Sequence, residues 1–118
     1  MEKENTFADY QLPPLDLLDE YIPEDKVSED KIANGRRAVV RIRSVLGDDA
    51  FRNSKAELPV AIGRTFGNKV KVFDLAKAPH LFIAGATKQG KTMAIHTVVA
   101  SLLYSKRPEE LKFVFIDP

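Results

Sequence analysis

Apolar and polar residues follow different patterns along this chain, and each pattern predicts a different kind of element. Up to Lys31 there is little periodicity, and three prolines interrupt any helix longer than a short one around LDLLDEY. We interpret residues 1–35 as an extended, acidic lead-in that is partly disordered. From Arg36 the alternation in RRAVVRIRSVL is typical of a strand with one solvent-facing side, on which the arginines are expected to lie.

The next part of the sequence predicts a helical turn and a β-hairpin. GDDAFRNSKAEL favours a short turn of helix, with Asp48 or Asp49 as its N-cap. LPVAIGRTFGNKVKVFDL indicates two strands around Gly67 and Asn68, residues that tolerate positive φ in tight turns.

The last part has the order strand, helix, strand. PHLFIAG is a short continuous apolar run, as in strands buried on both faces of a parallel sheet. From Lys91 the apolar residues fall at helical spacings, and the helix should end before Pro108. RPEE is then a loop, and LKFVFID is a second apolar strand. This order predicts an α/β fold with a right-handed parallel βαβ unit.

Composition narrows the possible functions. The chain has 118 residues, 44% of them hydrophobic and 30% charged, as in one soluble globular domain. No apolar run approaches the roughly 18 residues of a membrane span, the N-terminus lacks the features of a signal peptide, and the expected location is the cytoplasm. The absence of cysteine and the presence of only two histidines argue against redox chemistry and metal clusters.

The net charge of +1 conceals an asymmetry. Residues 1–31 carry ten acidic and three basic residues, whereas residues 32–118 carry seven acidic and fifteen basic ones. The basic part is compatible with binding of phosphate or nucleic acid, and equally with an ordinary solvated surface. Lys69 and Lys71, which alternate with valines, are expected on the solvent face of a strand, with a DNA contact as the alternative.

The strongest motif is HLFIAGATKQGKT, which fits the pattern G-x-x-x-x-G-K-S/T between a predicted strand and a predicted helix. Such a P-loop holds the β-phosphate of a nucleotide with backbone N–H groups, and its lysine, here Lys91, reaches the β- and γ-phosphates. The hydroxyl of Thr92 would bind Mg²⁺. The predicted ATP-binding residues are Gly85, Ala86, Thr87, Lys88, Gln89, Gly90, Lys91 and Thr92. An ordinary glycine-containing turn is the alternative, and it leaves the Gly-Lys-Thr spacing unexplained.

Three other residues are weaker candidates. Asp117, at the end of FVFID, resembles the acidic residue of a Walker B strand, which holds magnesium in many such ATPases. The strand directly after the P-loop helix is usually not the Walker B strand but lies further out in the sheet, and Pro118 stands where a catalytic glutamate would be. We therefore expect Asp117 to close its strand at the carboxyl edge of the sheet. His80 and His96 are expected to be solvated or capping, and no catalytic residue is assigned.

Three segments of the sequence resemble the motor region of the FtsK/SpoIIIE family of DNA translocases. They are YQLPPLDLL, FRNSKAELPVAIGRTFGNKVKVFDLAKAPHLFIAGATKQGKT and SLLYSKRPEELKFVFIDP. The resemblance implies a RecA-like ATPase that uses ATP and Mg²⁺ and assembles as a homo-hexameric ring on double-stranded DNA. It also implies a role in chromosome partition and cell division, or in conjugative transfer. Intact relatives are often anchored in the membrane by a segment that this chain does not contain.

The chain also departs from the family pattern. The family has a compact α/β domain after the Leu-Pro-Pro-Leu region, and its Walker B strand lies beyond the segment that resembles FVFIDP. We therefore expect residues 36–118 to be the N-terminal part of a motor domain, truncated before Walker B and not expected to hydrolyse ATP alone. Lys88 occupies a position where the family commonly has glycine, which strains the loop if that position needs positive φ.

Three alternative functions remain open at this point. The chain is either an ATP-binding fragment of such a translocase or a nonenzymatic remnant or interaction fragment without ATP turnover. A small DNA-binding module without nucleotide chemistry is a third possibility.

Overall fold

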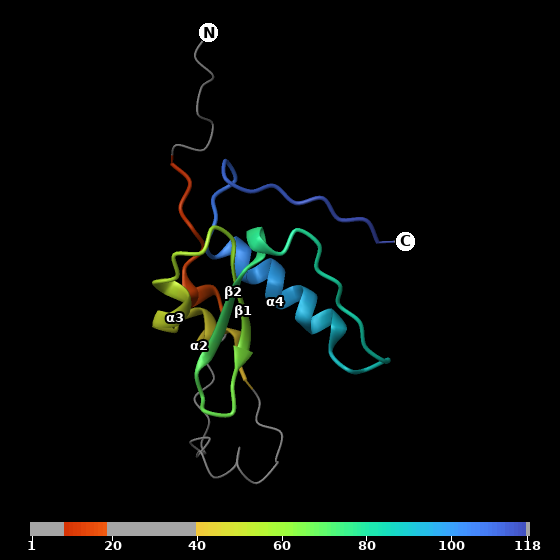
Figure 1. Ribbon diagram of the computed structural model, residues 1–118. Coiled ribbons are helices and arrows are strands. Elements are labelled where there is room, and N and C mark those ends of the chain that lie inside the picture. Colours follow the sequence, from red (N-terminus) through yellow and green to blue (C-terminus); the bar gives the residue numbers. More distant parts are fainter. Residues whose placement is uncertain (1–8, 19–39, 118) are drawn as a thin grey trace.

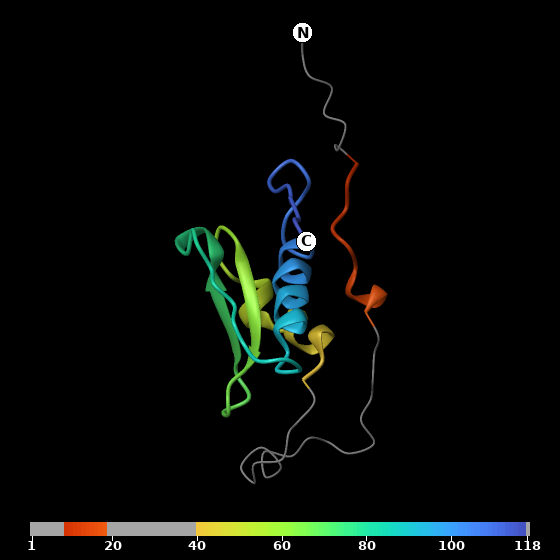
Figure 2. The ribbon, with the colours of Figure 1, turned by 90° about the vertical axis from the view of Figure 1, so that its right-hand side faces the viewer.

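The computed structural model describes residues 9–18 and 40–117, which form a small α/β unit around a two-stranded sheet (Figure 1). In chain order the elements are η1 (Leu15–Leu17), α2 (Ile42–Leu46), α3 (Asp49–Arg52), β1 (Pro59–Arg64), β2 (Val70–Asp74), η2 (Leu75–Lys77) and α4 (Lys91–Leu103). Helix α4 runs alongside β1, while α2 and α3 pack on the hairpin (Figure 2). None of the helices in these two ranges is long and apolar enough to cross a membrane.

The predicted hairpin is confirmed. Strands β1 and β2 pair antiparallel, from Pro59 opposite Asp74 to Arg64 opposite Val70. A register shift between Ala61 and Gly63 places a bulge at Ile62, which is 61% exposed.

The hairpin loop consists of residues 66–68. The N–H of Thr65 donates to the carbonyl of Lys69 at 2.9 Å, and the N–H of Asn68 donates to the carbonyl of Thr65 at 2.9 Å. Asn68 has φ 58°, so the left-handed residue of the loop is Asn68 and not Gly67. This arrangement, with a left-handed residue in third position, is a common three-residue hairpin loop.

The predicted helical turn after Leu46 is also confirmed. It is α3, and Asp48 is its N-cap, with a carboxylate oxygen that accepts a hydrogen bond from the N–H of Ala50 at 3.0 Å.

The strand predicted from RRAVVRIRSVL is wrong for residues 42–46, which form helix α2. Residues 36–39 lie outside the described residues. The neighbours Val45 and Leu46 are both buried, whereas a strand with one wet face would bury only alternate residues. An alternation over four residues was therefore too short to distinguish the two-residue period of a strand from the 3.6-residue period of a helix. Arg43 is also not simply a solvent-facing residue, because its Nη1 donates to the carbonyl of Leu18 at 2.7 Å.

The hydrophobic core brings α2, α3 and β1 together. Its buried cluster consists of Val45, Leu46, Phe51 and Ala61. Partly buried apolar residues from the rest of the unit pack against it: Leu15, Leu18, Ile42, Val70, Val72, Ala100 and Tyr104. Val70 and Val72 thus face the core and Lys71 faces solvent, as the alternation in β2 predicted.

The described part of the lead-in lies against this core. Residues 9–14 are followed by the 3₁₀ turn η1, where the short helix was expected, and residues 19–21 of that expected helix lie outside the described residues. Leu15 and Leu18 pack on the core cluster, and Arg43 contacts the carbonyl of Leu18. Residues 9–18 of the acidic lead-in, which we call the strap, therefore contact the core rather than extend away from it.

Helix α4 agrees with its prediction, since it begins at Lys91 and ends at Leu103, before Pro108. The RPEE loop is a turn in which the N–H of Glu110 donates to the carbonyl of Arg107 at 3.0 Å.

The parallel βαβ unit is not present among the described residues, whose one sheet is the β1–β2 hairpin. The two segments predicted as its strands, 79–85 and 111–117, precede and follow α4 in the sequence and form no strand pairing. Phe82 is 89% exposed and Val114 is 87% exposed. A parallel strand depends on hydrogen bonds to neighbouring strands and on cover from both faces, and the described residues supply neither.

Candidate nucleotide-binding site

Asp74, at the end of β2, lies before the predicted loop in the chain and forms three hydrogen bonds to backbone N–H groups. Its Oδ1 accepts hydrogen bonds from the N–H groups of Leu58 at 2.9 Å and Ala76 at 3.1 Å, and its Oδ2 accepts one from Glu57 at 3.1 Å. The bond from Leu58 is the main cause that holds the pKa of this carboxyl below its ordinary value, and the charge of Lys77 adds to it. One carboxylate thus joins the start of β1, the end of β2 and η2.

The predicted loop turns sharply before it enters α4. The N–H of Gln89 donates to the carbonyl of Ala86 at 3.1 Å, which closes a β-turn. Lys88 has φ 64° and Gly90 has φ 89°, so two of the eight loop residues are left-handed. Lys88, where the resemblance implies glycine, thus has the conformation that glycine adopts at least cost.

Gly85 lies where the chain folds back on itself. A Cβ built at this residue would lie 3.3 Å from Cγ of Lys91 and 3.6 Å from Cβ of Gln89. At Gly90 an added Cβ would meet open space, so the positive φ alone favours glycine there. The first glycine of the motif therefore makes room for the lysine stem, and the second permits the turn into the helix.

The N-terminus of α4 opens directly on this loop. Its N-cap is Gly90, and no side chain caps it. The first N–H groups of a helix lack partners within the helix, and the helix dipole adds about half a positive charge at that end. A 13-residue helix with an uncapped N-terminus after a glycine-rich turn provides donors suited to a phosphate.

The charges around the loop have one sign. From residue 75 to residue 108 the sequence contains no aspartate or glutamate, and Asp74 and Glu109 are the nearest acids on either side. The same stretch contains the cations Lys77, Lys88, Lys91, Lys106 and Arg107. The residues next to the loop in the sequence therefore include no acidic side chain that would repel an anion at the helix N-terminus.

Helix α4 is held on the hairpin by a buried serine. Ser101 has no exposed surface, and its Oγ accepts a hydrogen bond from the N–H of Ala61 at 3.1 Å. The same hydroxyl donates to the carbonyl of Thr97, one turn earlier in the helix, at 2.7 Å. The loop is thereby connected to the core through its helix. The sequence analysis did not predict a role for Ser101. Its position among the apolar residues of α4 could have indicated a buried polar contact.

All eight residues predicted to bind nucleotide, 85–92, are exposed and contiguous at the N-terminal end of α4. Asp117 is also exposed, in a segment that forms no strand, and His80 and His96 are exposed as expected. Within the described ranges no three or more histidine, cysteine or acidic residues gather to hold a metal ion. Thr92 is exposed at the start of α4, and its hydroxyl oxygen is the kind of ligand that Mg²⁺ accepts.

The profile of the FtsK/SpoIIIE family matches residues 41–118, which include the hairpin, the loop and α4. The chain belongs to the FtsK/SpoIIIE family. The resemblance inferred from the motifs is thus confirmed. The strap residues 9–18 lie before the matched part of this FtsK/SpoIIIE chain.

Individual relatives agree with the family assignment. The chain is 47% identical over 85 residues to "DNA translocase FtsK" of Haemophilus influenzae, an alignment that covers 72% of this chain and 16% of that protein. It is 53% identical over 79 residues to the protein of the same name from Chlorobaculum tepidum, covering 67% of this chain and 10% of that one.

A longer alignment reaches into the lead-in. The relative of the same name from Haemophilus ducreyi is 39% identical over 101 residues, which is 86% of this chain and 11% of the relative. The FtsK/SpoIIIE chain described here therefore spans about a tenth to a sixth of the length of these relatives.

Proposed function

We propose that this chain is the ATP-binding part of a double-stranded DNA translocase motor of FtsK/SpoIIIE type. The observation that supports this most is the geometry of residues 85–92. Two left-handed residues lead into an uncapped helix, in a stretch of more than thirty residues without an acid. The name "DNA translocase FtsK" of the relatives supports the DNA part of the proposal.

The residues have the following proposed roles. Backbone N–H groups of residues 85–92 surround the β-phosphate, Lys91 pairs with the β- and γ-phosphates, and Thr92 binds Mg²⁺ through its hydroxyl. Bound ATP would supply the phosphoryl group whose hydrolysis drives movement along DNA. Residues 36–118 belong to the motor and residues 1–35 lead into it. In the assembled motor, segments 79–85 and 111–117 become parallel strands of one RecA-like sheet.

The wider role is proposed with the family. It comprises assembly as a homo-hexamer on double-stranded DNA in the cytoplasm, in chromosome partition, cell division or conjugative transfer. None of these roles assigns a catalytic residue within the 118 positions.

Titration calorimetry with ATP and Mg²⁺ tests the nucleotide part. Wild type is expected to bind, and Lys91→Ala is expected to show no measurable heat, because the charge opposite the β- and γ-phosphates is lost. Lys55→Ala is the matched control, since Lys55 is an exposed lysine outside the loop and should bind as wild type does. Equal heats for wild type and Lys91→Ala would contradict the proposal.

The metal ligand has a separate test. Thr92→Ala is expected to bind ATP with an affinity that depends less on Mg²⁺ than that of wild type, whereas Thr92→Ser keeps the hydroxyl and the full dependence. An unchanged response to Mg²⁺ in Thr92→Ala would remove Thr92 from the site.

A nonenzymatic interaction fragment is the second candidate. The exposed apolar residues of segments 79–85 and 111–117 favour it, because Phe82 and Ile116 are 89% and 90% exposed and offer surface for docking. ATP turnover by the purified chain that disappears in Lys91→Ala would exclude this candidate.

A further inference from the structure

The strap, residues 9–18, is a self-contained element. Two backbone hydrogen bonds form inside it, from the N–H of Leu17 to the carbonyl of Pro14 at 3.2 Å and from the N–H of Leu18 to the carbonyl of Leu15 at 3.0 Å. The one sheet of the described residues is the β1–β2 hairpin, so the strap pairs with no strand. An element that shares no strand pairing with the core can leave it and return as a unit.

Two leucines and one arginine attach the strap to the core. Leu15 and Leu18 pack on the core cluster, and a Cβ built at Gly47, the C-cap of α2, would lie 3.4 Å from Cδ1 of Leu15. Nη1 of Arg43 donates to the carbonyl of Leu18 at 2.7 Å, and its Nη2 lies 3.5 Å from Oδ1 of Asp16. The strap is therefore held mainly by α2 and its C-terminal end.

The strap does not fill the groove in which it lies. A cleft of about 550 Å³ remains between it and the core, lined on the strap side by Leu12 and Pro13 and on the core side by Phe51 and Tyr104. Leu12 and Leu17 are also 41% and 72% exposed. Because protein interiors are close-packed, a contact with such a gap is looser than the core itself, and the strap leaves at a lower cost than α2 or α3 would.

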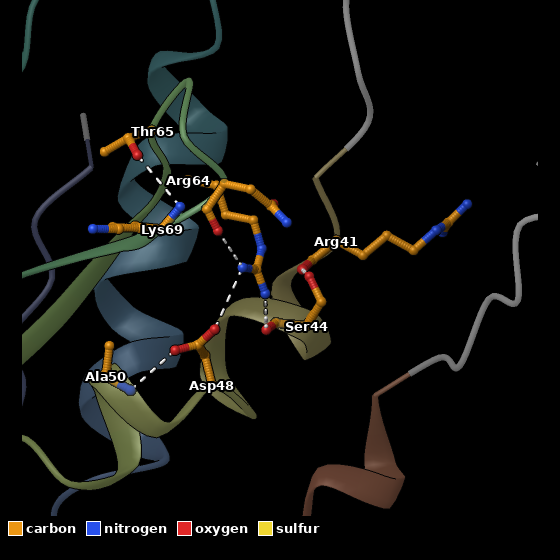
Figure 3. A network of polar contacts seen from close by, with 8 residues as sticks. Arg41, Ser44, Asp48, Ala50, Arg64, Thr65 and Lys69 are labelled. Atoms are coloured by element: carbon orange, nitrogen blue, oxygen red, sulfur yellow. Dashed lines mark hydrogen bonds and ion pairs between the residues drawn. The ribbon is translucent and has the colours of Figure 1, made fainter. Parts of the chain in front are cut away.

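The face of the core that receives the strap is braced independently of it (Figure 3). Nη2 of Arg64, in β1, donates to the carbonyl of Ser44, in α2, at 2.8 Å. The same guanidinium pairs with Asp48, the N-cap of α3, at 3.3 Å, and donates to the carbonyl of Asn68 at 2.8 Å. None of these partners belongs to the strap. A face that keeps its shape loses little conformational entropy when a segment docks on it.

The connection between the strap and α2 is long enough to reach another copy of the chain. Twenty-four residues separate Leu18 from Arg43, and a fully extended chain of that length spans roughly 80 Å, more than the 62 Å of the longest axis of the unit. A strap from the same copy and a strap from a second copy make the same contacts. The choice between them therefore depends on concentration, and a linker of this size holds a strap near its own core at an effective concentration on the order of 1 mM.

We propose that the strap is exchanged between copies of this chain, so that residues 9–18 of one copy dock on α2 of another. A second copy is the partner that already carries the complementary groups. They are the two leucines for the apolar groove, and the Leu18 carbonyl and Asp16 for the charge of Arg43. The exchange needs neither ATP nor DNA. In the homo-hexamer proposed above it would join neighbouring subunits, and this last step alone rests on the proposed function.

Analytical ultracentrifugation of the whole chain is the first test. The fraction of copies joined to another copy is expected to be about a tenth near 0.1 mM and about half near 1 mM, since exchange competes with docking in the same copy. Leu15→Asp is expected to abolish this association, because it places a charge in the apolar groove. Leu17→Asp is the matched control, since Leu17 is 72% exposed and its replacement should leave the association unchanged.

The sequence contains no cysteine, which allows a selective cross-link as the second test. A copy with Leu15→Cys is mixed with a tagged copy that carries Gly47→Cys in a glutathione redox buffer, and mass spectrometry measures the disulfide between the two. This disulfide is expected to form, and to be lost when Arg43→Ala is added to the Gly47→Cys copy. Leu17→Cys in place of Leu15→Cys measures chance encounters. A double variant with both cysteines in one copy checks that the two positions can be bridged.

Three outcomes would overturn the inference. They are a chain that stays monomeric up to about 1 mM, association that survives Leu15→Asp, and a cross-link between copies no more frequent than that of Leu17→Cys. If Leu15→Asp does not fold, or if the double variant forms no internal disulfide, the other measurement decides. Neither test involves a nucleotide, so ATP binding by a chain that does not exchange its strap would leave the nucleotide proposal standing.

Discussion

The hairpin and the segments 79–85 and 111–117 both contain apolar residues, but the strands of the hairpin bury several of theirs, whereas the two segments leave most of theirs exposed. Val60 and Ala61 in β1 have no exposed surface, whereas Phe82 and Ile116, on either side of α4, are about nine-tenths exposed. The hairpin pairs with itself across a three-residue loop, and α2, α3 and α4 cover it. Parallel strands cannot pair across a short turn, because each needs a crossover connection and neighbours from elsewhere. The contrast shows that local pairing completes the first region while the second depends on distant strands.

The largest effect is expected from removing a core side chain. Leu46→Ala should reduce the free energy of unfolding by about 2–5 kcal/mol, because Leu46 is 2% exposed and its removal leaves a cavity in the core. Phe82→Ala, at a residue that is mostly exposed, should change it by less than about 0.5 kcal/mol. Urea unfolding followed by circular dichroism measures both. Equal losses would mean that segment 79–85 is packed in solution, and the contrast between the two regions would fail.

The next largest loss of stability is expected from Ser101, whose hydroxyl joins α4 to β1. Ser101→Ala should cost about 1–3 kcal/mol, because the buried N–H of Ala61 loses its acceptor. Ser105→Ala is the matched control, since that hydroxyl donates only to the carbonyl of Leu102, at 3.3 Å and near the end of α4. The same unfolding measurement applies. If Ser101→Ala were no more costly than Ser105→Ala, α4 would not be held on β1 through this hydroxyl.

A smaller effect is expected within the loop. Lys88→Gly should stabilise the chain by about 1 kcal/mol relative to Lys88→Ala, because φ is 64° at this residue and only glycine adopts it without cost. Both variants remove the same charge, so their difference in thermal unfolding isolates the backbone. Equal stability would show that position 88 is not left-handed in solution.

The last prediction concerns pH dependence rather than stability at neutral pH. The pKa of Asp74 is held below its ordinary value of 3.8, chiefly by the N–H of Leu58. Its stabilising contribution is therefore fully present above the pKa of the unfolded chain and is lost as the pH falls through the lower folded pKa. Asp74→Asn should flatten this part of the curve of stability against pH. If wild type and Asp74→Asn lost stability identically as the pH falls, the Asp74 carboxylate would make no pH-dependent contribution to the fold.

Local signals in the sequence predicted what the structure forms locally. The Asp48 cap, the hairpin around Gly67 and Asn68, and the bounds of α4 all depend on residues within a few positions of one another. The sequence analysis left open whether position 88 needs positive φ, and the structure gives Lys88 φ 64°. For these elements, turn chemistry and helix spacing were sufficient.

The features that the sequence did not predict depend on contacts between residues that are far apart in the chain. Val45 and Leu46 lie in a helix and pack with Phe51 and Ala61. The short alternation of apolar residues and arginines before them gave no indication of that contact. Asp74 and Ser101 bond to residues 16 or more positions away, which no spacing pattern reveals. The nucleotide-binding role of residues 85–92 stays a prediction until it is measured.

The contact between Arg43 and Leu18 has a consequence for how this polypeptide tolerates insertions. The 2.7 Å hydrogen bond holds together two points that are separated by 24 residues in the sequence. The hydrogen bond fixes Leu18 and Arg43 beside each other on the core, so an insertion between them would leave both ends of the connection in place. Doubling the length of a flexible connection adds only about 0.6 kcal/mol of closure entropy. Evolution or a protein engineer can thus place a whole additional domain between Leu18 and Arg43 while the core around α2 and the hairpin keeps its structure.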